Sequence, residues 1–174
     1  MFWLNIIKNF IKILRQGQTP AQIAGGFALG ALVGIAPVFT LQGLLIWLLI
    51  LILDVNLSAA ILSFTLFTLI AYIFDPFFHA LGYLLLVNFS GLRGLWSSLY
   101  NAPIAPLTRF NNTVVMGSFV CGLLLFLPIY VGMKRFVVAY RTHIGAQVER
   151  WRIYQVISRS VLVRWYSRIR NLGE

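Results

Sequence analysis

The chain has 174 residues, of which 60% are hydrophobic and only 10% carry a charged side chain. A soluble domain of ordinary composition is about 45–50% apolar and about 25% charged. A fold of this length also exposes more surface than 14 basic and 4 acidic side chains can cover. The apolar composition excludes a disordered chain, and the single cysteine, Cys121, excludes a disulfide-stabilised fold. The sequence therefore predicts an all-α integral membrane protein.

Basic residues are concentrated at the two ends of the chain. Between residues 16 and 133 the charged residues are Asp54, Asp75, Arg93 and Arg109. Basic residues that flank membrane segments are retained on the cytoplasmic side. We therefore expect a multi-pass protein with both termini in the cytoplasm. The basic tail is expected to contact anionic lipid head groups and not nucleic acid. The residues expected to make this contact are Lys134, Arg135, Arg141, Arg150 and Arg152.

Three regions are predicted along the chain. In residues 1–18, lysine and asparagine alternate with large apolar residues at spacings of three and four, which predicts an amphipathic helix in the plane of the membrane interface. Residues 134–174 combine an apolar stripe with arginines and predict a second amphipathic helix, which forms a cytoplasmic tail. Residues 19–133 form the transmembrane domain between them.

The uncharged stretch that begins at Thr19 is too long for one spanning helix. As a single helix it would be about 50 Å long, against a hydrocarbon core of about 30 Å. Thr19 and Gln22 form a capping-box pattern at its start, and Pro37 predicts a break. The two resulting pieces, residues 21–36 and 39–53, are each about 23 Å long. This length predicts a re-entrant or strongly tilted helical hairpin.

A second apolar block repeats this design. It starts with a polar turn in which Asn56 or Ser58 can cap the next helix. Residues 59–74 then lead to Pro76, and residues 77–89 form another short apolar piece. Paired hydrophobic segments interrupted by proline are typical of transporters with a binding site near the membrane midplane. The sequence therefore predicts a second proline-broken hairpin.

The cleanest spanning helix follows a connecting stretch at residues 90–112. Residues 114–133 are about twenty apolar positions, with Asn112 or Thr113 as the cap and two basic residues directly after them. If this helix returns to the cytoplasm, the connecting stretch lies on the outer side of the membrane.

Glycines recur every fourth residue at Gly26, Gly30 and Gly34. Such a stripe allows two helix backbones to approach closely in lipid. The alternative is a glycine face that admits a ligand or permits a hinge beside Pro37. A polar side chain in lipid needs a partner, so we expect Gln42 to bond to the broken backbone near Pro37.

Asp75 and His79 are the most suggestive polar pair. On a continuous helix, residues four apart share a face, and acidic and histidine side chains inside membranes mark proton relays. Asp75 is also a candidate cap for a helix that begins at Pro76. A third interpretation is a structural ion pair with Arg93 or Arg109.

A dense polar cluster at residues 108–113 precedes the last spanning helix. One interpretation is a group of helix caps. The other is a contact with a partner protein or a lipid head group, made by Arg109, Asn111 and Asn112. The sequence has no carboxylate pair placed for acid–base chemistry, no metal-ligand set and no nucleotide-binding loop. We therefore expect no enzyme activity, no metal and no cofactor.

Several strings carry a family resemblance. They are GFALG at residues 26–30, GIAP at 34–37, LQ at 41–42, FDPFFHALG at 74–82 and TRFNNTVVMGS at 108–118. Together they resemble a family of small bacterial inner-membrane proteins of unknown function, over about residues 5–140. The resemblance implies a bacterial inner-membrane location and a larger envelope protein encoded alongside. It implies no catalytic residues.

The leading functional hypothesis is a non-enzymatic inner-membrane subunit that anchors or assists a larger envelope complex, with lipid transport as the candidate process. The alternative is an autonomous small transporter or lipid scramblase that uses the proline-broken hairpins. A third hypothesis is a membrane-surface organiser that acts through the tail. A homo-oligomer is compatible with each of them.

Overall fold

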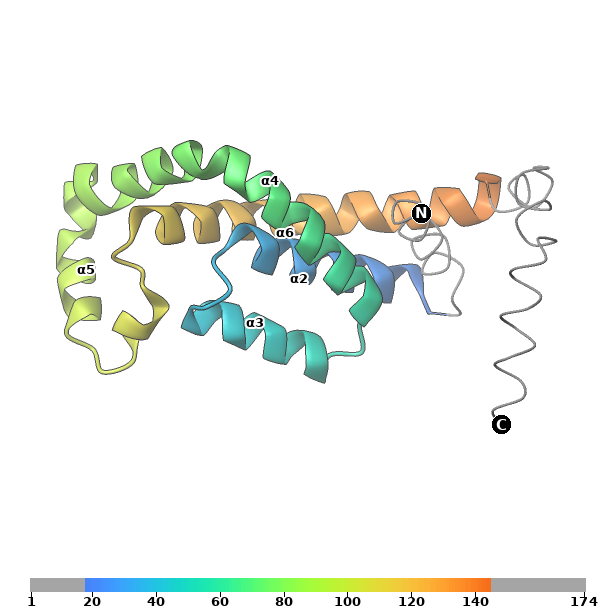
Figure 1. The fold of residues 1–174 in the computed structure, drawn as a ribbon, viewed down its shortest axis with the longest axis horizontal. Helices are drawn as coiled ribbons and strands as arrows, with labels where there is room; N and C mark the ends of the chain where they lie inside the picture. Colours follow the sequence, from blue (N-terminus) through green and yellow to red (C-terminus); the bar gives the residue numbers. More distant parts are fainter. Residues whose placement is uncertain (1–17, 145–174) are drawn as a thin grey trace. The chain divides into compact units, whose positions relative to one another are not determined.

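The computed structural model describes residues 18–144, which are helical with no strand in this range (Figure 1). The predicted N-terminal amphipathic helix and most of the predicted tail lie outside the described residues. The chain divides into two compact units, residues 1–137 and 138–174, and the packing that positions the candidate site lies in the first. The α-helices are α2 (Pro20–Ile35), α3 (Leu41–Ile52), α4 (Leu57–Tyr83), α5 (Arg93–Tyr100) and α6 (Thr113–Ala139). Two π-helical turns (Leu84–Asn88 and Tyr140–Ile144) and two 3-10 turns (Ser90–Leu92 and Ala105–Thr108) complete the described chain.

Helices α2 and α3 form the first predicted hairpin. The Thr19 backbone N–H donates to Oε1 of Gln22 at 2.8 Å, and the Gln22 N–H donates to Oγ1 of Thr19 at 3.2 Å, so the predicted capping box is confirmed. Helix α2 ends at Ile35 and α3 starts only at Leu41, so the break predicted at Pro37 is confirmed as well. The two helices are about 24 Å and 18 Å long.

The glycine stripe of α2 packs against the backbone of α4. Successive glycines of the stripe face backbone positions that are also four residues apart, at the start of α4. The pairs are Gly26 with Asn56, Gly30 with Ala60, and Gly34 with Phe64. A side-chain carbon built on Gly34 would lie only 2.7 Å from the carbonyl oxygen of Phe64. Because both residue numbers rise together, α2 and α4 are parallel, with α3 as the return segment. The close packing predicted from the glycine spacing is confirmed.

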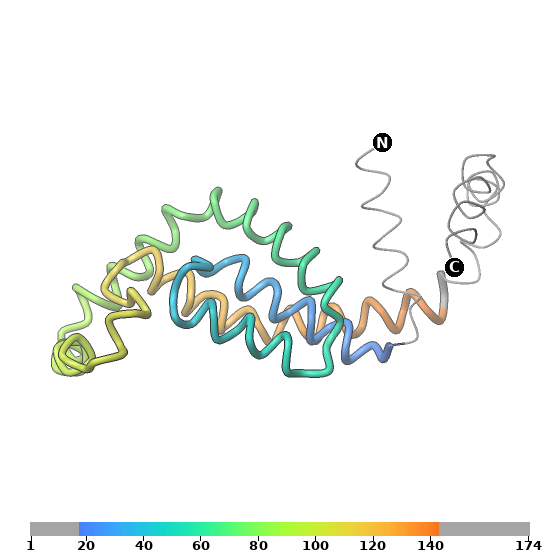
Figure 2. The backbone as a smooth tube through the Cα atoms, turned by 60° about the horizontal axis from the view of Figure 1, so that its bottom comes forward, coloured from blue at the N-terminus to red at the C-terminus, as the bar shows by residue number. Residues whose placement is uncertain are grey.

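Helix α4 continues through Pro76 as one helix of 27 residues, so the prediction of a second proline-broken hairpin is wrong. Figures 1 and 2 show α4 as an arc that passes over the α2–α3 hairpin. A bend is the usual result when a proline interrupts the hydrogen bonds of a helix interior. Beyond the proline, α4 packs antiparallel to the start of α6, where Gly82 meets the backbone of Thr113 and Gly117 meets that of Phe78.

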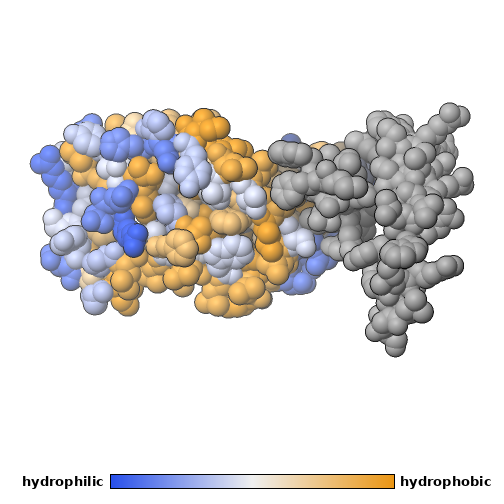
Figure 3. Space-filling model, viewed as in Figure 1, coloured by the Kyte–Doolittle hydropathy of each residue, from blue (hydrophilic) through white to orange (hydrophobic). Residues whose placement is uncertain are grey.

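Helices α4 and α6 are long and apolar enough to cross a membrane, counting the π-turns that extend them to Asn88 and Thr142. Helix α6 continues past the predicted end at residue 133. Large apolar side chains lie exposed along α3, α4 and α6. On the face shown in Figure 3, apolar side chains cover α3 and α4, and hydrophilic side chains gather at the end formed by α5.

The buried core forms around α2. Its buried apolar residues on α2 pack against Ile46 and Ile50 of α3 and Ala60 of α4. Trp47 of α3 meets Phe64 of α4 edge to face, with ring centroids 5.6 Å apart. Helix α2 is therefore the central element of the core. Helices α3, α4 and α6 each leave one apolar face exposed.

We expect Gly30→Ala to destabilise the protein by about 1–3 kcal/mol, because the added methyl group overlaps the backbone of Ala60. The matched control is Gly132→Ala in α6, where nothing lies within 4 Å of the added carbon. Thermal unfolding of both variants in mild detergent measures the difference. An equal effect of the two substitutions would contradict close packing at Gly30.

Candidate functional site

The tip of the α2–α3 hairpin is held by Thr40, whose side chain is buried. Its Oγ1 donates to the carbonyl oxygen of Pro37 at 2.8 Å and accepts the backbone N–H of Gly43 at 3.3 Å. The Thr40 side chain therefore both caps α3 and closes the turn between α2 and α3. The sequence carried a signal for this role, since threonine directly before an apolar helix is a common N-cap.

A cavity of about 280 Å³ lies between the hairpin tip and the middle of α4. Helix α4 lines it with residues at helical spacing, and α6 lines it with Val114, near the start of that helix. The lining residues are Gly34, Ile35, Ala36, Pro37, Val38, Phe39, Thr68, Ala71, Tyr72, Asp75 and Val114. Two of the lining residues on α4 carry a polar group on an aliphatic side chain. They are Thr68, with a hydroxyl, and Asp75, with a carboxylate, and they lie two turns apart.

Asp75 lies half-buried in the interior of α4 and does not cap a helix. The interpretation of Asp75 as a cap before Pro76 is therefore wrong, because the helix continues on both sides of it. Within residues 18–142, no hydrogen bond or ion pair engages its carboxylate, so the alternative interpretation of an ion pair with Arg93 or Arg109 is not supported there. Asp75 is thus a carboxylate without a partner at the wall of the cavity.

His79 faces a different neighbour. Its Nδ1 lies 2.7 Å from Oγ1 of Thr113, the first residue of α6, and its ring lies 6.2 Å from that of Tyr83. The structure therefore gives His79 a contact that joins α4 to the start of α6. It does not hydrogen-bond to Asp75.

Gln42 does not bond to the backbone near Pro37, so this prediction is wrong. Its Nε2 donates to the carbonyl oxygen of Thr108 at 2.9 Å, and its Oε1 is buried without a hydrogen-bond partner in the described chain. The Pro37 carbonyl already accepts from Thr40. Gln42 therefore ties the hairpin to the 3-10 turn that precedes α6.

The polar cluster before α6 contains the predicted cap. Oδ1 of Asn112 accepts the backbone N–H groups of Val114 and Val115 at 2.9 and 3.2 Å. The Asn112 N–H donates to the carbonyl of Arg109, which has a left-handed backbone with φ 54°. The interpretation as a cap cluster is confirmed for Asn112.

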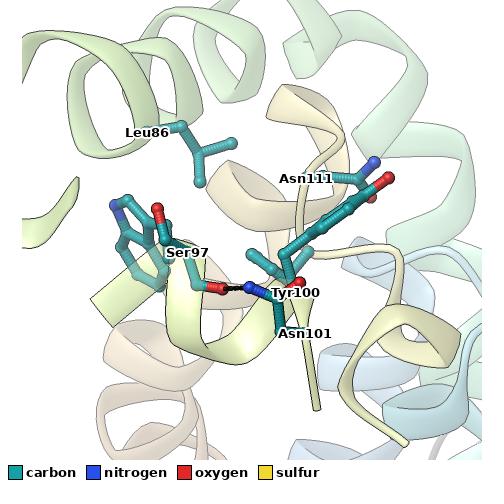
Figure 4. A pocket seen from close by; sticks show the side chains of 7 residues that line it. Leu86, Ser97, Tyr100, Asn101 and Asn111 are labelled. Atoms are coloured by element: carbon teal, nitrogen blue, oxygen red, sulfur yellow. Dashed lines mark hydrogen bonds between the residues drawn. The ribbon is translucent and has the colours of Figure 1, made fainter. Parts of the chain in front are cut away.

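Asn111 lines a second, more open cavity of about 380 Å³ near α5. In Figure 4, Tyr100 and Asn111 border this cavity, and the side-chain nitrogen of Asn101 donates to the Ser97 carbonyl at 2.9 Å. The indole N–H of Trp96 donates to the carbonyl of Leu85 at 3.1 Å. These bonds fix the walls of the cavity between α5 and the end of α4.

A polar network at the open end of the hairpin was not predicted. Nε2 of Gln22 donates to Oδ2 of Asp54 at 2.6 Å, and the backbone N–H of Asn56 donates to the Gln22 carbonyl at 3.0 Å. Asn56 is buried and caps α4 by accepting the N–H of Ala59 at 2.7 Å. The sequence indicated the Asn56 cap, but nothing in it linked Gln22 to Asp54, which lies 32 residues away.

The predicted lipid-contact residues lie at the end of α6 and beyond it. Lys134 and Arg135 are exposed on α6, and Arg141 is exposed in the π-turn that follows. Arg150 and Arg152 lie outside the described residues.

Over residues 18–144 the fold is that of a small helical protein, with two helices of membrane-spanning length and a mainly apolar cavity at the tip of a short hairpin. The chain belongs to the family described as "Uncharacterized protein conserved in bacteria (DUF2062)", whose model matches residues 5–144. A protein of Treponema pallidum (strain Nichols), named "Uncharacterized protein", is 27% identical over 156 residues, which cover 90% of this chain and 96% of that protein. No solved structure matches the chain.

Removal of the cap at the start of α6 should weaken the fold. We expect Asn112→Ala to lower the free energy of unfolding by about 0.5–2 kcal/mol, because two backbone N–H groups lose their acceptor. Asn111→Ala is the matched control, since the structure gives Asn111 no hydrogen bond within the described residues. Chemical unfolding followed by tryptophan fluorescence compares the two, and equal losses would argue against the cap.

Proposed function

We propose that the protein is a multi-pass protein of the bacterial inner membrane with both termini in the cytoplasm. The exposure of its long helices supports this location. In the most apolar 18-residue windows of α4 and α6, only 17% and 22% of the residues are buried. A core helix of a soluble protein would be mostly buried, whereas lipid covers such surfaces in a membrane protein.

The depth of the hairpin supports a re-entrant arrangement. Its tip meets α4 between Thr68 and Asp75, which lie about 16 to 27 Å along the helix from Leu57. Its open end returns to the level of Asn56, where α4 begins. In this proposal the hairpin enters from the cytoplasmic side and turns back inside the bilayer. A broken backbone at this depth requires burial in protein, and the buried Thr40 turn satisfies this requirement.

The function that we propose is that of a non-enzymatic membrane subunit, which anchors or assists a larger envelope complex in lipid transport. One observation carries it, namely the extent of apolar surface that the chain itself leaves uncovered. On α3, only Gly43, Ile46 and Ile50 are buried, although this helix is too short to span the bilayer. Lipids and the helices of a partner are the two surroundings that cover such a face. In this proposal Lys134, Arg135 and Arg141 contact anionic head groups at the cytoplasmic leaflet.

The second candidate function is an autonomous small transporter or scramblase. The cavity at the hairpin tip favours it, because an unpartnered carboxylate inside a membrane commonly lies on an ion or substrate path. This alternative needs no partner protein.

The proposed topology predicts opposite accessibility for two serines. In a Cys121→Ala background, we expect a membrane-impermeant maleimide to label Ser98→Cys on α5 from the outside of the inner membrane. Ser58→Cys at the start of α4 should react only after the inner membrane is opened. Both serines are exposed, so burial does not explain a difference. Labelling of both positions from one side would contradict the topology.

Co-purification tests the role as a subunit. We expect tagged protein at native expression, extracted in mild detergent, to retain a larger envelope protein in a fixed stoichiometry, identified by mass spectrometry. The control is an unrelated multi-pass inner-membrane protein with the same tag. Recovery of the protein alone, with bound lipid, would contradict the subunit hypothesis and favour the transporter.

A further inference from the structure

We propose that the open cavity between α5 and the end of α4 binds the head group of an anionic phospholipid that carries free hydroxyls, of the phosphatidylglycerol class. Three features meet there, namely a half-buried apolar floor, polar side chains that no described residue engages, and two arginines beside the opening. This inference rests on the proposed membrane location. It does not depend on a partner protein or on which side of the membrane α5 faces.

The floor of the cavity is apolar. Trp96 of α5 and Phe110 of the loop before α6 have ring centroids 6.0 Å apart, and Leu86 comes from the π-turn that extends α4. All three side chains are half-buried. The indole N–H of Trp96 already donates to the Leu85 carbonyl, so the rest of its ring is apolar contact surface. Such a floor fits the glycerol backbone and the first methylene groups of a lipid, at the interface where tryptophan is enriched.

The polar side chains lie at the mouth of the cavity. Ser97, Tyr100 and Asn111 are exposed lining residues, and within residues 18–144 no hydrogen bond engages their side chains (Figure 4). The side-chain nitrogen of Asn101 is already committed, since it donates to the Ser97 carbonyl. Two hydroxyls and one primary amide can each donate and accept a hydrogen bond. They therefore match a ligand that carries hydroxyl groups of its own.

Two arginines give the rim of the cavity a positive charge. On α5, Arg93 lies four residues before Ser97 and seven before Tyr100, so the three share one face of the helix. Arg109 lies in the loop, directly before a lining aromatic ring. Over residues 18–144 no ion pair engages either guanidinium, and the sequence contains no acidic residue from 76 to 148. An anionic ligand is therefore the natural partner of this rim.

These groups together select the class of lipid. The guanidinium group binds phosphate oxygens through paired hydrogen bonds, so a phosphodiester fits beside the arginines. A phosphatidylethanolamine head group adds an ammonium group, which the arginines repel. Phosphatidic acid has the phosphate but no hydroxyls for the polar side chains at the mouth. Phosphatidylglycerol has both, and the cavity of about 380 Å³ lies within the usual size range of small-ligand sites.

Site-resolved photo-crosslinking tests the proposal on the purified full-length protein in detergent micelles. The probe is a phosphatidylglycerol with a diazirine early in one acyl chain, and peptide mass spectrometry locates the crosslinks. We expect crosslinks within residues 86–111. Unlabelled phosphatidylglycerol should suppress them at least fivefold better than phosphatidylethanolamine, because each arginine near a lipid head group contributes about this factor. Equal suppression by the two lipids would overturn the proposed selection by charge.

Two neighbouring serines test the polar mouth of the cavity. Ser97→Ala removes a lining hydroxyl and should weaken the competition by phosphatidylglycerol about two- to tenfold. Ser98→Ala is the matched control, because Ser98 is not a lining residue and its hydroxyl donates to the Gly94 carbonyl at 3.0 Å. Equal competition in the two variants would overturn the role of the hydroxyl.

Two arginines test the charge at the rim. Arg93→Gln should lower the preference for phosphatidylglycerol over phosphatidylethanolamine about fivefold at residues 86–111. Arg135→Gln on α6 removes the same charge from a helix that is distant in sequence, and its own lipid contacts fall in other peptides. It should leave the preference at residues 86–111 unchanged. A preference that both variants leave intact would overturn the rim as the anion site.

Two further competitors separate the lipid from simpler phosphates. Glycerophosphoglycerol is the same head group without acyl chains, and it should compete much more weakly because nothing contacts the apolar floor. Competition equal to that of the lipid would assign the cavity to a soluble phosphodiester and overturn the lipid. Equal competition by phosphatidic acid would overturn the contribution of the head-group hydroxyls.

The result is independent of the proposed subunit role. If the crosslinks and their competition hold while the protein purifies without a partner, the lipid site stands and the subunit hypothesis fails. If a partner co-purifies but no crosslink falls within residues 86–111, the lipid site is overturned while the subunit hypothesis stands.

Discussion

The close approach of α2 and α4 is the contact on which the rest of the fold depends. At Gly26, Gly30 and Gly34 the α2 backbone lies directly against that of α4, with no room for a side chain. Van der Waals packing between small residues is a principal source of helix association in lipid, where the hydrophobic effect between helices is absent. This contact makes the two helices parallel, so the chain between them must return the full length of α2. Helix α3 is that return, and the depth of the hairpin tip follows from the length of α2.

The same mode of packing recurs on the other half of α4, with a different partner. Gly82 and Gly117 bring α4 against the start of α6 in the antiparallel sense. Helix α4 therefore passes from one glycine contact to another, and Pro76 lies between them. Tertiary contacts on both sides of the proline offset the lost hydrogen bond, which costs about 3 kcal/mol in an isolated helix. This is the physical reason why the helix continues through Pro76 and does not end there.

The sequence was most informative where the pattern is local. The capping box at Thr19, the break at Pro37, the cap at Asn112 and the glycine spacing all concern residues within a few turns of one another, and the structure confirms each. The Asp75–Pro76 pair was different, because an acidic residue before proline fits a helix start as well as a bent helix interior. Only the contacts of Gly82 with Thr113 decide between them. Gln42 and Gln22 were missed or misassigned for a related reason, since their partners, Thr108 and Asp54, are distant in sequence.

The position of the cavity follows from the two glycine contacts. Before Thr68, α4 lies against α2, and after Asp75 it lies against α6. Along this stretch α2 has already ended at Ile35, and Val114 is the residue that α6 contributes to the lining of the cavity. A tight glycine interface thus produces a gap where one partner helix stops and the next begins. The half-buried carboxylate of Asp75 lies at that gap, on the α4 wall of the cavity.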